Sequence, residues 1–173
     1  SLLGLALLTI AGSLQADLSQ SQTITTAAGN GTYDFSGDGG TATSASLRGP
    51  FGVTVDAVGN LYVADGENYR IRKVTQQGVI STFAGNGSPY FGGDGGPATS
   101  AAFSPGYLAF DLAGNMYFSD WANFRIRKIT PTGMISTVAG NGSGGSSGDG
   151  GPATIASLTY PFGVAVDAAG NLF

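Results

Sequence analysis

Residues 36–45 read SGDGGTATSA, and this pattern returns twice further along the chain. It recurs as GGDGGPATSAA at residues 92–102 and as SGDGGPATIA at residues 147–156. The Gly-Asp-Gly-Gly core begins at positions 37, 93 and 148, which gives spacings of 56 and 55 residues. A fixed period of this size is typical of structural units that repeat and stack on their neighbours. The period therefore indicates a repeat protein.

The composition of the 173-residue chain limits its chemistry. Its 30 glycines show no Gly-X-Y period, which excludes collagen, and its hydrophobic residues, 42% of the total, argue against disorder. No cysteine or histidine is present, so cysteine-dependent zinc sites, thiol nucleophiles and Ser-His-Asp triads are excluded within these residues. The net charge is −4, and six of the seven basic residues lie in two copies of one tetrapeptide, at 70–73 and 125–128. Nucleic acid is therefore not an expected partner.

The first 16 residues, SLLGLALLTIAGSLQA, are uncharged and mostly apolar. This run is shorter than the roughly 20 residues that span a bilayer, and it matches the apolar core and small-residue end of a secretory signal peptide. The alternative is a buried strand or helix of the domain. We interpret residues 1–16 as a truncated signal peptide and residues 17–173 as the domain. The mature protein is then expected to be secreted, periplasmic or on the cell surface, without membrane insertion.

Each repeat contains four short apolar runs that are separated by turn residues. Runs rich in Val, Ile, Phe and Tyr with tight turns predict an antiparallel meander. The expected strands cover 51–55, 61–64, 70–75 and 79–84 in one copy, and 107–110, 116–119, 125–130 and 134–139 in the next. In the third strand, Ile71 and Val74 are the expected buried positions. They lie three residues apart, so a bulge around Arg72 is needed to place them on one face.

The repeats resemble a known family. Residues 55–75, VDAVGNLYVADGENYRIRKVT, resemble the NHL repeat, and the connection containing Gly-Asp-Gly-Gly-Pro-Ala-Thr resembles that of bacterial secreted NHL proteins and of the teneurin propeller. Residues 117–126, YFSDWANFRI, also resemble the Tyr-Trp-Thr-Asp propellers of lipoprotein receptors. The residues that match the NHL motif, and that we expect to be structural, are Asp56, Gly59, Asn60, Arg70, Asp111, Gly114, Asn115 and Arg125.

The resemblance covers about residues 22–173 and implies an all-β fold, a β-propeller of four-stranded antiparallel blades. It implies blades at about 50–84 and 106–139 and an incomplete blade at 161–173, which is about two and a half blades of a six-bladed ring. Residues 22–28 match only the outer, fourth strand, so we expect them to close a final blade beyond Phe173. The chain is thus interpreted as a fragment. Its exposed blade faces and strand edges are expected to make it associate.

The long connections at 29–49, 85–105 and 140–160 are expected on one face of the propeller, framing the mouth of the pore. The loops 65–69 and 120–124 are expected on that same face, and the Asp-x-x-Gly-Asn turns on the opposite one. Connections of this length are usually functional or disordered, and strict repetition argues against disorder. The candidate ligand-binding residues of this face are Asp38, Asp94, Asp149, Asp65, Asp120, Trp121 and Tyr90.

Each candidate also has a structural interpretation. Asp38 and its two counterparts could hold a cation or ligand, or could cap a glycine turn. Asp65 and Asp120 could form ion pairs with Arg70 and Arg125, five residues later. The aromatic residues could anchor a partner or fill gaps between blades.

A loop that occurs once per blade is a better candidate for docking than for a unique reaction centre. The expected function is therefore non-catalytic: an extracytoplasmic binding or scaffold propeller for a protein or glycan, without a cofactor. The alternative is a lyase or lactonase with a divalent cation in the pore, as implied by a resemblance to gluconolactonases and amidating lyases. In that case the site would lie mostly outside these residues.

Overall fold

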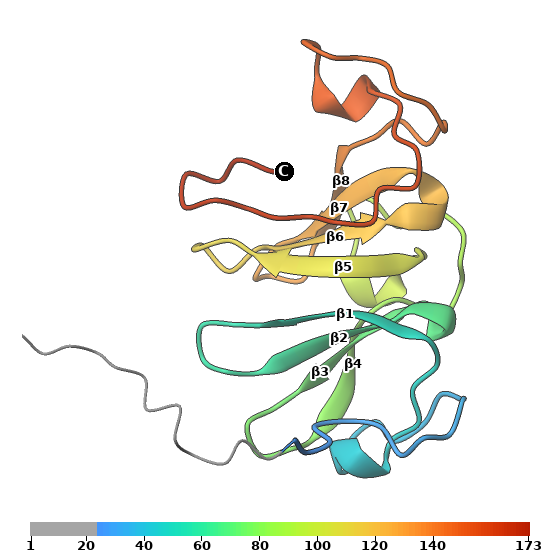
Figure 1. Ribbon diagram of the computed structural model, residues 1–173, viewed down its shortest axis with the longest axis vertical. Helices are drawn as coiled ribbons and strands as arrows, with labels where there is room; N and C mark the ends of the chain where they lie inside the picture. Colours follow the sequence, from blue (N-terminus) through green and yellow to red (C-terminus); the bar gives the residue numbers. More distant parts are fainter. Residues whose placement is uncertain (1–23) are drawn as a thin grey trace, which may run out of the picture.

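The computed structural model describes residues 24–173, which form two four-stranded antiparallel sheets followed by a hairpin (Figure 1). The first sheet, called the first blade below, has the order β1-β2-β3-β4, and the second blade has the order β5-β6-β7-β8. The strands are β1 (Pro50–Val55), β2 (Leu61–Asp65), β3 (Arg70–Val74), β4 (Ile80–Ala84), β5 (Pro105–Phe110), β6 (Met116–Asp120), β7 (Arg125–Ile129) and β8 (Ile135–Ala139). Five single-turn 3-10 helices lie between them, η1 (Ala42–Ser44), η2 (Gly66–Asn68), η3 (Ala98–Ser100), η4 (Trp121–Asn123) and η5 (Ala153–Ile155).

The strands agree with the predicted meander to within two residues at each end. The predicted bulge is also present, because the pairing of β3 with β4 shifts register between Ile71 and Arg72. Ile71 and Val74 are both buried, as expected. The sequence did not indicate that Arg72, the residue at the bulge, is fully buried as well.

The two blades pack face to face, with their first strands adjacent. At Gly52 in β1 a Cβ atom would lie 2.7 Å from the carbonyl oxygen of Gly106 and from the Cα of Tyr107 in β5, so the two backbones touch. Behind this contact lies a continuous core, because residues of both blades and of the connection between them are buried together. Its largest members are Tyr62, Ile71, Phe103, Leu108, Met116, Phe118, Ile129 and Ile135.

The first two long connections fold back onto the outer strand of the blade that follows each of them. Gly39 donates its N–H to the carbonyl of Ile80 in β4 at 2.8 Å, and Ile80 donates in return to Gly40 at 3.0 Å. The second connection repeats this arrangement against Ile135 in β8. The Gly-Asp-Gly-Gly segments therefore cover the outer edges of the sheets, where open backbone groups would invite association. The prediction that they frame the pore mouth is wrong, because the strands that lie inside are β1 and β5.

The third copy forms a hairpin, in which Ala165 and Phe173 exchange two backbone hydrogen bonds of 2.9 Å. The predicted signal peptide at 1–16 lies outside the described residues. Of the predicted closing strand, residues 24–28 are described and belong to no strand, so their pairing with a later blade stays a prediction. Within residues 24–173, no helix has the length and apolar character needed to cross a membrane.

Candidate functional site

The two ends of the blades differ in the loops they carry. Gly66 in η2 donates its N–H to the carbonyl of Gly49, and Trp121 in η4 donates to Ser104, so these loops lie against the ends of the long connections. The turns 56–60 and 111–115 project from the opposite ends of the strands (Figure 1). We call these two ends the long-loop face and the turn face. This arrangement confirms the predicted placement of both sets of loops.

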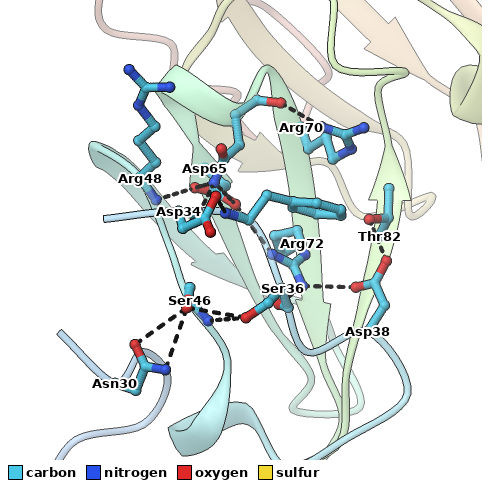
Figure 2. Close-up of polar contacts among 12 residues, drawn as sticks. Asn30, Asp34, Ser36, Asp38, Ser46, Arg48, Asp65, Arg70, Arg72 and Thr82 are labelled. Carbon is cyan, nitrogen blue, oxygen red and sulfur yellow. Dashed lines mark hydrogen bonds and ion pairs between the residues drawn. The ribbon is translucent and has the colours of Figure 1, made fainter. Parts of the chain in front are cut away.

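A buried arginine connects three parts of the first blade (Figure 2). The Arg72 Nη1 lies 3.2 Å from the Asp65 Oδ2, with both side chains fully buried, and the Nη2 lies 2.7 Å from the Asp38 Oδ1. Asp38 also accepts a hydrogen bond from the Thr82 hydroxyl at 2.7 Å. The hydrogen bonds from Thr82 and Arg72 lower the pKa of Asp38 although its partial burial acts to raise it. Arg72 therefore fixes the long connection to the sheet.

The second blade repeats this cluster, with one more hydrogen bond between the arginine and the aspartate of the long connection. The Arg127 Nη2 and Nε both donate to the Asp94 Oδ1, at 2.7 Å and 3.1 Å, and the Nη1 donates to the Asp120 Oδ2 at 3.1 Å. Burial raises the pKa of Asp120, although Ser104, Asn123 and Arg127 all favour its charged form. A buried pair of this kind costs desolvation energy and is retained when its geometry and further hydrogen bonds compensate.

These contacts correct the predicted ion pairs. Asp65 and Asp120 pair with the arginines seven residues later, whereas Arg70 and Arg125 make other contacts. Arg70 donates to the carbonyls of Asn68 and Asn86, and its guanidinium lies over a phenyl ring, 4.1 Å from the centroid of Phe35. The sequence could not separate the two arginines, because only the bulge decides which one points inward.

The third acidic candidate has no such partner. Asp149 occupies the position of Asp38 and Asp94, but no arginine of residues 24–173 pairs with it. The chain ends before the strand that would carry the equivalent arginine. The two paired copies show that this aspartate joins a connection to its blade, so we assign Asp38 and Asp94 a structural role.

The Asp-x-x-Gly-Asn turns are held by their aspartate. Asp56 accepts hydrogen bonds from the backbone of Val58 and Asn60, from the Asn60 amide at 2.8 Å and from the Tyr62 hydroxyl at 3.1 Å. Slight burial acts to raise the pKa of Asp56, but these hydrogen bonds outweigh it and the net pKa is lowered. Burial and the nearby carboxylate raise the pKa of Tyr62 to about 12. Asp111 repeats the same contacts, so the hydrogen bonds of the predicted structural motif are satisfied within each turn.

A row of aromatic side chains crosses the long-loop face. Its members, called the aromatic row below, are Phe51, Trp121, Phe124, Tyr160 and Phe162. The Trp121 ring stacks on Phe162, with centroids 5.7 Å apart and planes 20° apart, and meets Phe51 edge-on at 6.4 Å. Tyr160 connects Trp121, at 6.2 Å, to Phe124, at 5.2 Å. Phe51, Phe162 and Tyr160 are 48%, 50% and 52% exposed, so the row presents open ring surface.

This row breaks the repeat. In the first blade the Phe51 ring lies against Gly66, which leaves no space there for a side chain. In the second blade the ring and the glycine have changed places. Gly106 stands at the position of Phe51, and Trp121 stands at the position of Gly66. A Cβ on Gly106 would lie 2.5 Å from the Ser119 Oγ, so that position excludes a ring.

Tyr160 departs from the first copy in residue type but keeps its backbone conformation. Its φ is +42°, in the left-handed region, as is the φ of +54° at the equivalent Gly49. A left-handed conformation costs a non-glycine residue about 1–2 kcal/mol. Strain of this kind concentrates at functional sites, and here it places an aromatic ring beside Trp121.

The sequence therefore predicted this site in part. Of the two predicted aromatic residues, Trp121 lies in the row, whereas Tyr90 is 75% exposed and contacts no other aromatic ring among the described residues. Phe51, Tyr160 and Phe162 were missed, although the three copies show phenylalanine at both 51 and 162, and Tyr160 at the position of Gly49. No group of three or more His, Cys, Asp or Glu side chains that could hold a metal ion occurs within residues 24–173.

Comparison with known proteins gives matches to the same repeat. Residues 14–92 match the family model described as the teneurin NHL domain. Teneurin-4 of Mus musculus is 52% identical over 50 residues, which are 29% of this chain and 2% of that protein. The protein SUPPRESSOR OF QUENCHING 1, chloroplastic, of Arabidopsis thaliana is 30% identical over 155 residues, covering 84% of this chain and 14% of that protein. The chain thus spans a small fraction of both relatives.

Solved structures share the architecture. A protein of unknown function from Bacteroides thetaiotaomicron aligns with a TM-score of 0.65 and 27% identity, over 76% of this chain and 34% of the other. An auxiliary nutrient binding protein from Bacteroides ovatus aligns with a TM-score of 0.57 and 20% identity, over 73% and 34% of the two chains, and shows the fold alone. The chain is therefore similar to the teneurin NHL domain over residues 14–92, and its two blades have the β-propeller fold of these solved structures.

Proposed function

We propose that the chain is part of a non-catalytic binding propeller that holds a protein or glycan on the aromatic row of its long-loop face. The observation that carries this proposal is the contrast between the copies. The acidic residues that repeat in both blades are engaged in ion pairs and turns, whereas Phe51 and Trp121 of the aromatic row differ between the two blades. Exposed aromatic side chains are enriched among the residues that dominate binding energy.

Phe51 is exposed even though a neighbouring blade packs beside it. That residue has the second blade beside it, in direct backbone contact at Gly52, and is still 48% exposed. Phe162 holds the equivalent position in the third copy and is 50% exposed. A further blade is therefore expected to leave Phe162 open to a ligand as well.

The location in this proposal is extracytoplasmic, and it rests on the apolar residues 1–16. The solved auxiliary nutrient binding propeller is compatible with a binding role, but its 20% identity carries no more than the fold. No cofactor forms part of the proposal. The competing function is a propeller lyase or lactonase with a divalent cation in the pore, which the experiment below separates from binding.

Trp121 makes the proposal directly testable, because it is the only tryptophan in the chain. The full chain would be screened against arrays of glycans and of tryptophan-free peptides, and each binder would be titrated while the Trp121 emission is recorded. We expect a binder to shift the emission. Trp121→Ala has no tryptophan, so its affinity is measured by isothermal titration calorimetry, and it should raise the Kd of that binder about tenfold or more. Leu112→Ala, at an 87% exposed apolar residue on the turn face, is the matched control.

Two results would overturn the proposal. One is a screen in which no glycan or peptide depends on Trp121. The other is stoichiometric divalent metal in the purified protein together with lyase or lactonase turnover.

A further inference from the structure

Resting on the proposed binding role of the aromatic row, we propose that its ligand is an uncharged saccharide. Glu67 lies at one end of the row. Glu67 follows Gly66, the residue beneath the Phe51 ring, and a Cβ at Gly49 would lie 2.9 Å from the Glu67 Cγ. The carboxylate of Glu67 therefore sits beside the row.

This end of the row carries a compact polar cluster. The Arg48 Nε lies 3.4 Å from the Glu67 Oε2, with the two side chains 47% and 44% exposed. The Tyr33 hydroxyl donates to the same carboxylate oxygen, and the Arg48 guanidinium lies over the Tyr33 ring, 5.0 Å from its centroid. The cluster thus presents guanidinium donors and carboxylate acceptors to solvent side by side.

The polar cluster departs from the repeat just as the row does. In the second copy, alanine replaces the glutamate at position 122, serine replaces the arginine at 104 and proline replaces the tyrosine at 89. No structural role common to all blades therefore explains these three side chains. Their coincidence with the row at the long-loop face indicates one composite site.

The charges of the polar cluster cancel, because Arg48 and Glu67 form an ion pair. An anionic or cationic ligand would be held by an unpaired charge of the opposite sign. A neutral ligand whose groups both donate and accept hydrogen bonds suits a paired arginine and glutamate better.

A saccharide can both hydrogen-bond to the Arg48–Glu67 pair and cover the exposed aromatic rings. Its hydroxyls donate and accept, so they can bridge Arg48 and Glu67 without a net charge. Its ring also has a face formed by C–H groups, and covering the exposed surface of Phe51, Tyr160 and Phe162 with that face removes apolar area from water. Trp121 stacks on Phe162 and supports its ring from one side.

The test titrates the full chain with cellohexaose, laminarihexaose and maltoheptaose, and with trigalacturonic acid and a tryptophan-free peptide array as comparators. We expect at least one neutral oligosaccharide to change the Trp121 emission. Raising the salt concentration from about 0.05 to 0.5 M should change its Kd less than about twofold, because screening acts on charged ligands.

Three variants localise the effect. Measured by isothermal titration calorimetry, which needs no tryptophan, Trp121→Ala should weaken oligosaccharide binding about tenfold or more, and Arg48→Ser and Glu67→Gln about three- to tenfold. Leu112→Ala should leave the Kd unchanged. Circular dichroism and urea unfolding of each variant separate lost binding from lost folding.

The outcomes distinguish this inference from the proposed function. Peptide binding that depends on Trp121, without saccharide binding, would overturn the saccharide and leave the binding role standing. Binding of trigalacturonic acid alone, with strong salt dependence, would also overturn the neutral ligand. Absence of any Trp121-dependent binder would overturn both.

Discussion

The arginine clusters and the aromatic row show two opposite relations to the repeat. Arg72 and Arg127 occupy equivalent positions, and each ties two aspartates to the same places in its blade. Phe51 and Trp121 lie on the same face of the molecule, but their equivalents in the other blade are glycines. The arginine clusters are copied and buried, whereas Phe51 and Trp121 differ between the two blades and the row is partly exposed.

This difference separates fold from function. A contact that every blade needs must be present in every copy, because each blade packs on its neighbours in the same way. A binding site needs to exist only once, so it can arise where the copies diverge. The predictions below test whether the two features differ in this way.

The largest effect is expected from removing a buried guanidinium. Arg127→Met should lower the free energy of unfolding by about 3–5 kcal/mol, because Asp120 would stay buried without its partner. Arg125→Met is the control, since Arg125 donates to carbonyls and stacks on Phe91, and should cost about 1–2 kcal/mol. Urea unfolding measures both, and equal losses would contradict the assignment of the structural arginine.

A smaller loss is expected within the repeated connection. At Gly37 the φ is +90° and a Cβ would lie 2.6 Å from the Ala45 Cβ, so Gly37→Ala combines strain with a clash and should cost about 3 kcal/mol. At Gly39 the φ is +82° but nothing lies within 4 Å, so Gly39→Ala should cost about 1–2 kcal/mol. Thermal unfolding compares the two variants. A larger loss of stability in Gly39→Ala than in Gly37→Ala would be inconsistent with a packed connection.

The aspartates of the connection should differ between copies. Asp38→Asn should cost about 1 kcal/mol, because its ion pair with Arg72 is partly open to solvent. Asp149→Asn should change the stability of this chain by less than about 0.5 kcal/mol, because no arginine of the described region pairs with it. Denaturant midpoints of the two variants check this, and a destabilising Asp149 variant would point to a role beyond pairing.

A small effect on stability is also expected in the aromatic row. Trp121→Ala should change the free energy of unfolding by about 1 kcal/mol, because Trp121 is only partly buried and η4 keeps its backbone contacts. The same variant should weaken ligand binding, so stability and binding move separately. A loss comparable to that of Arg127→Met would place Trp121 among the structural residues.

The sequence was sufficient for the architecture, because its information is local and repeated. Apolar runs at fixed spacing predict strands, and the Asp-x-x-Gly-Asn turns close on themselves through hydrogen bonds within five residues. The bulge at Arg72 followed from the need to place Ile71 and Val74 on one face. Each of these inferences depends on neighbours along the chain.

Contacts between distant residues were not predictable in this way. Arg72 and Asp38 are 34 residues apart, and only the folding of the connection onto the outer strand brings them together. The same holds for Trp121 and Phe162, which meet because the third copy returns to the inner strands of the blades. The sequence by itself determined the blades and their turns, since their hydrogen bonds are local. Only the tertiary structure decided which charges are neutralised and which aromatic rings share a surface, because both depend on how the connections and blades pack.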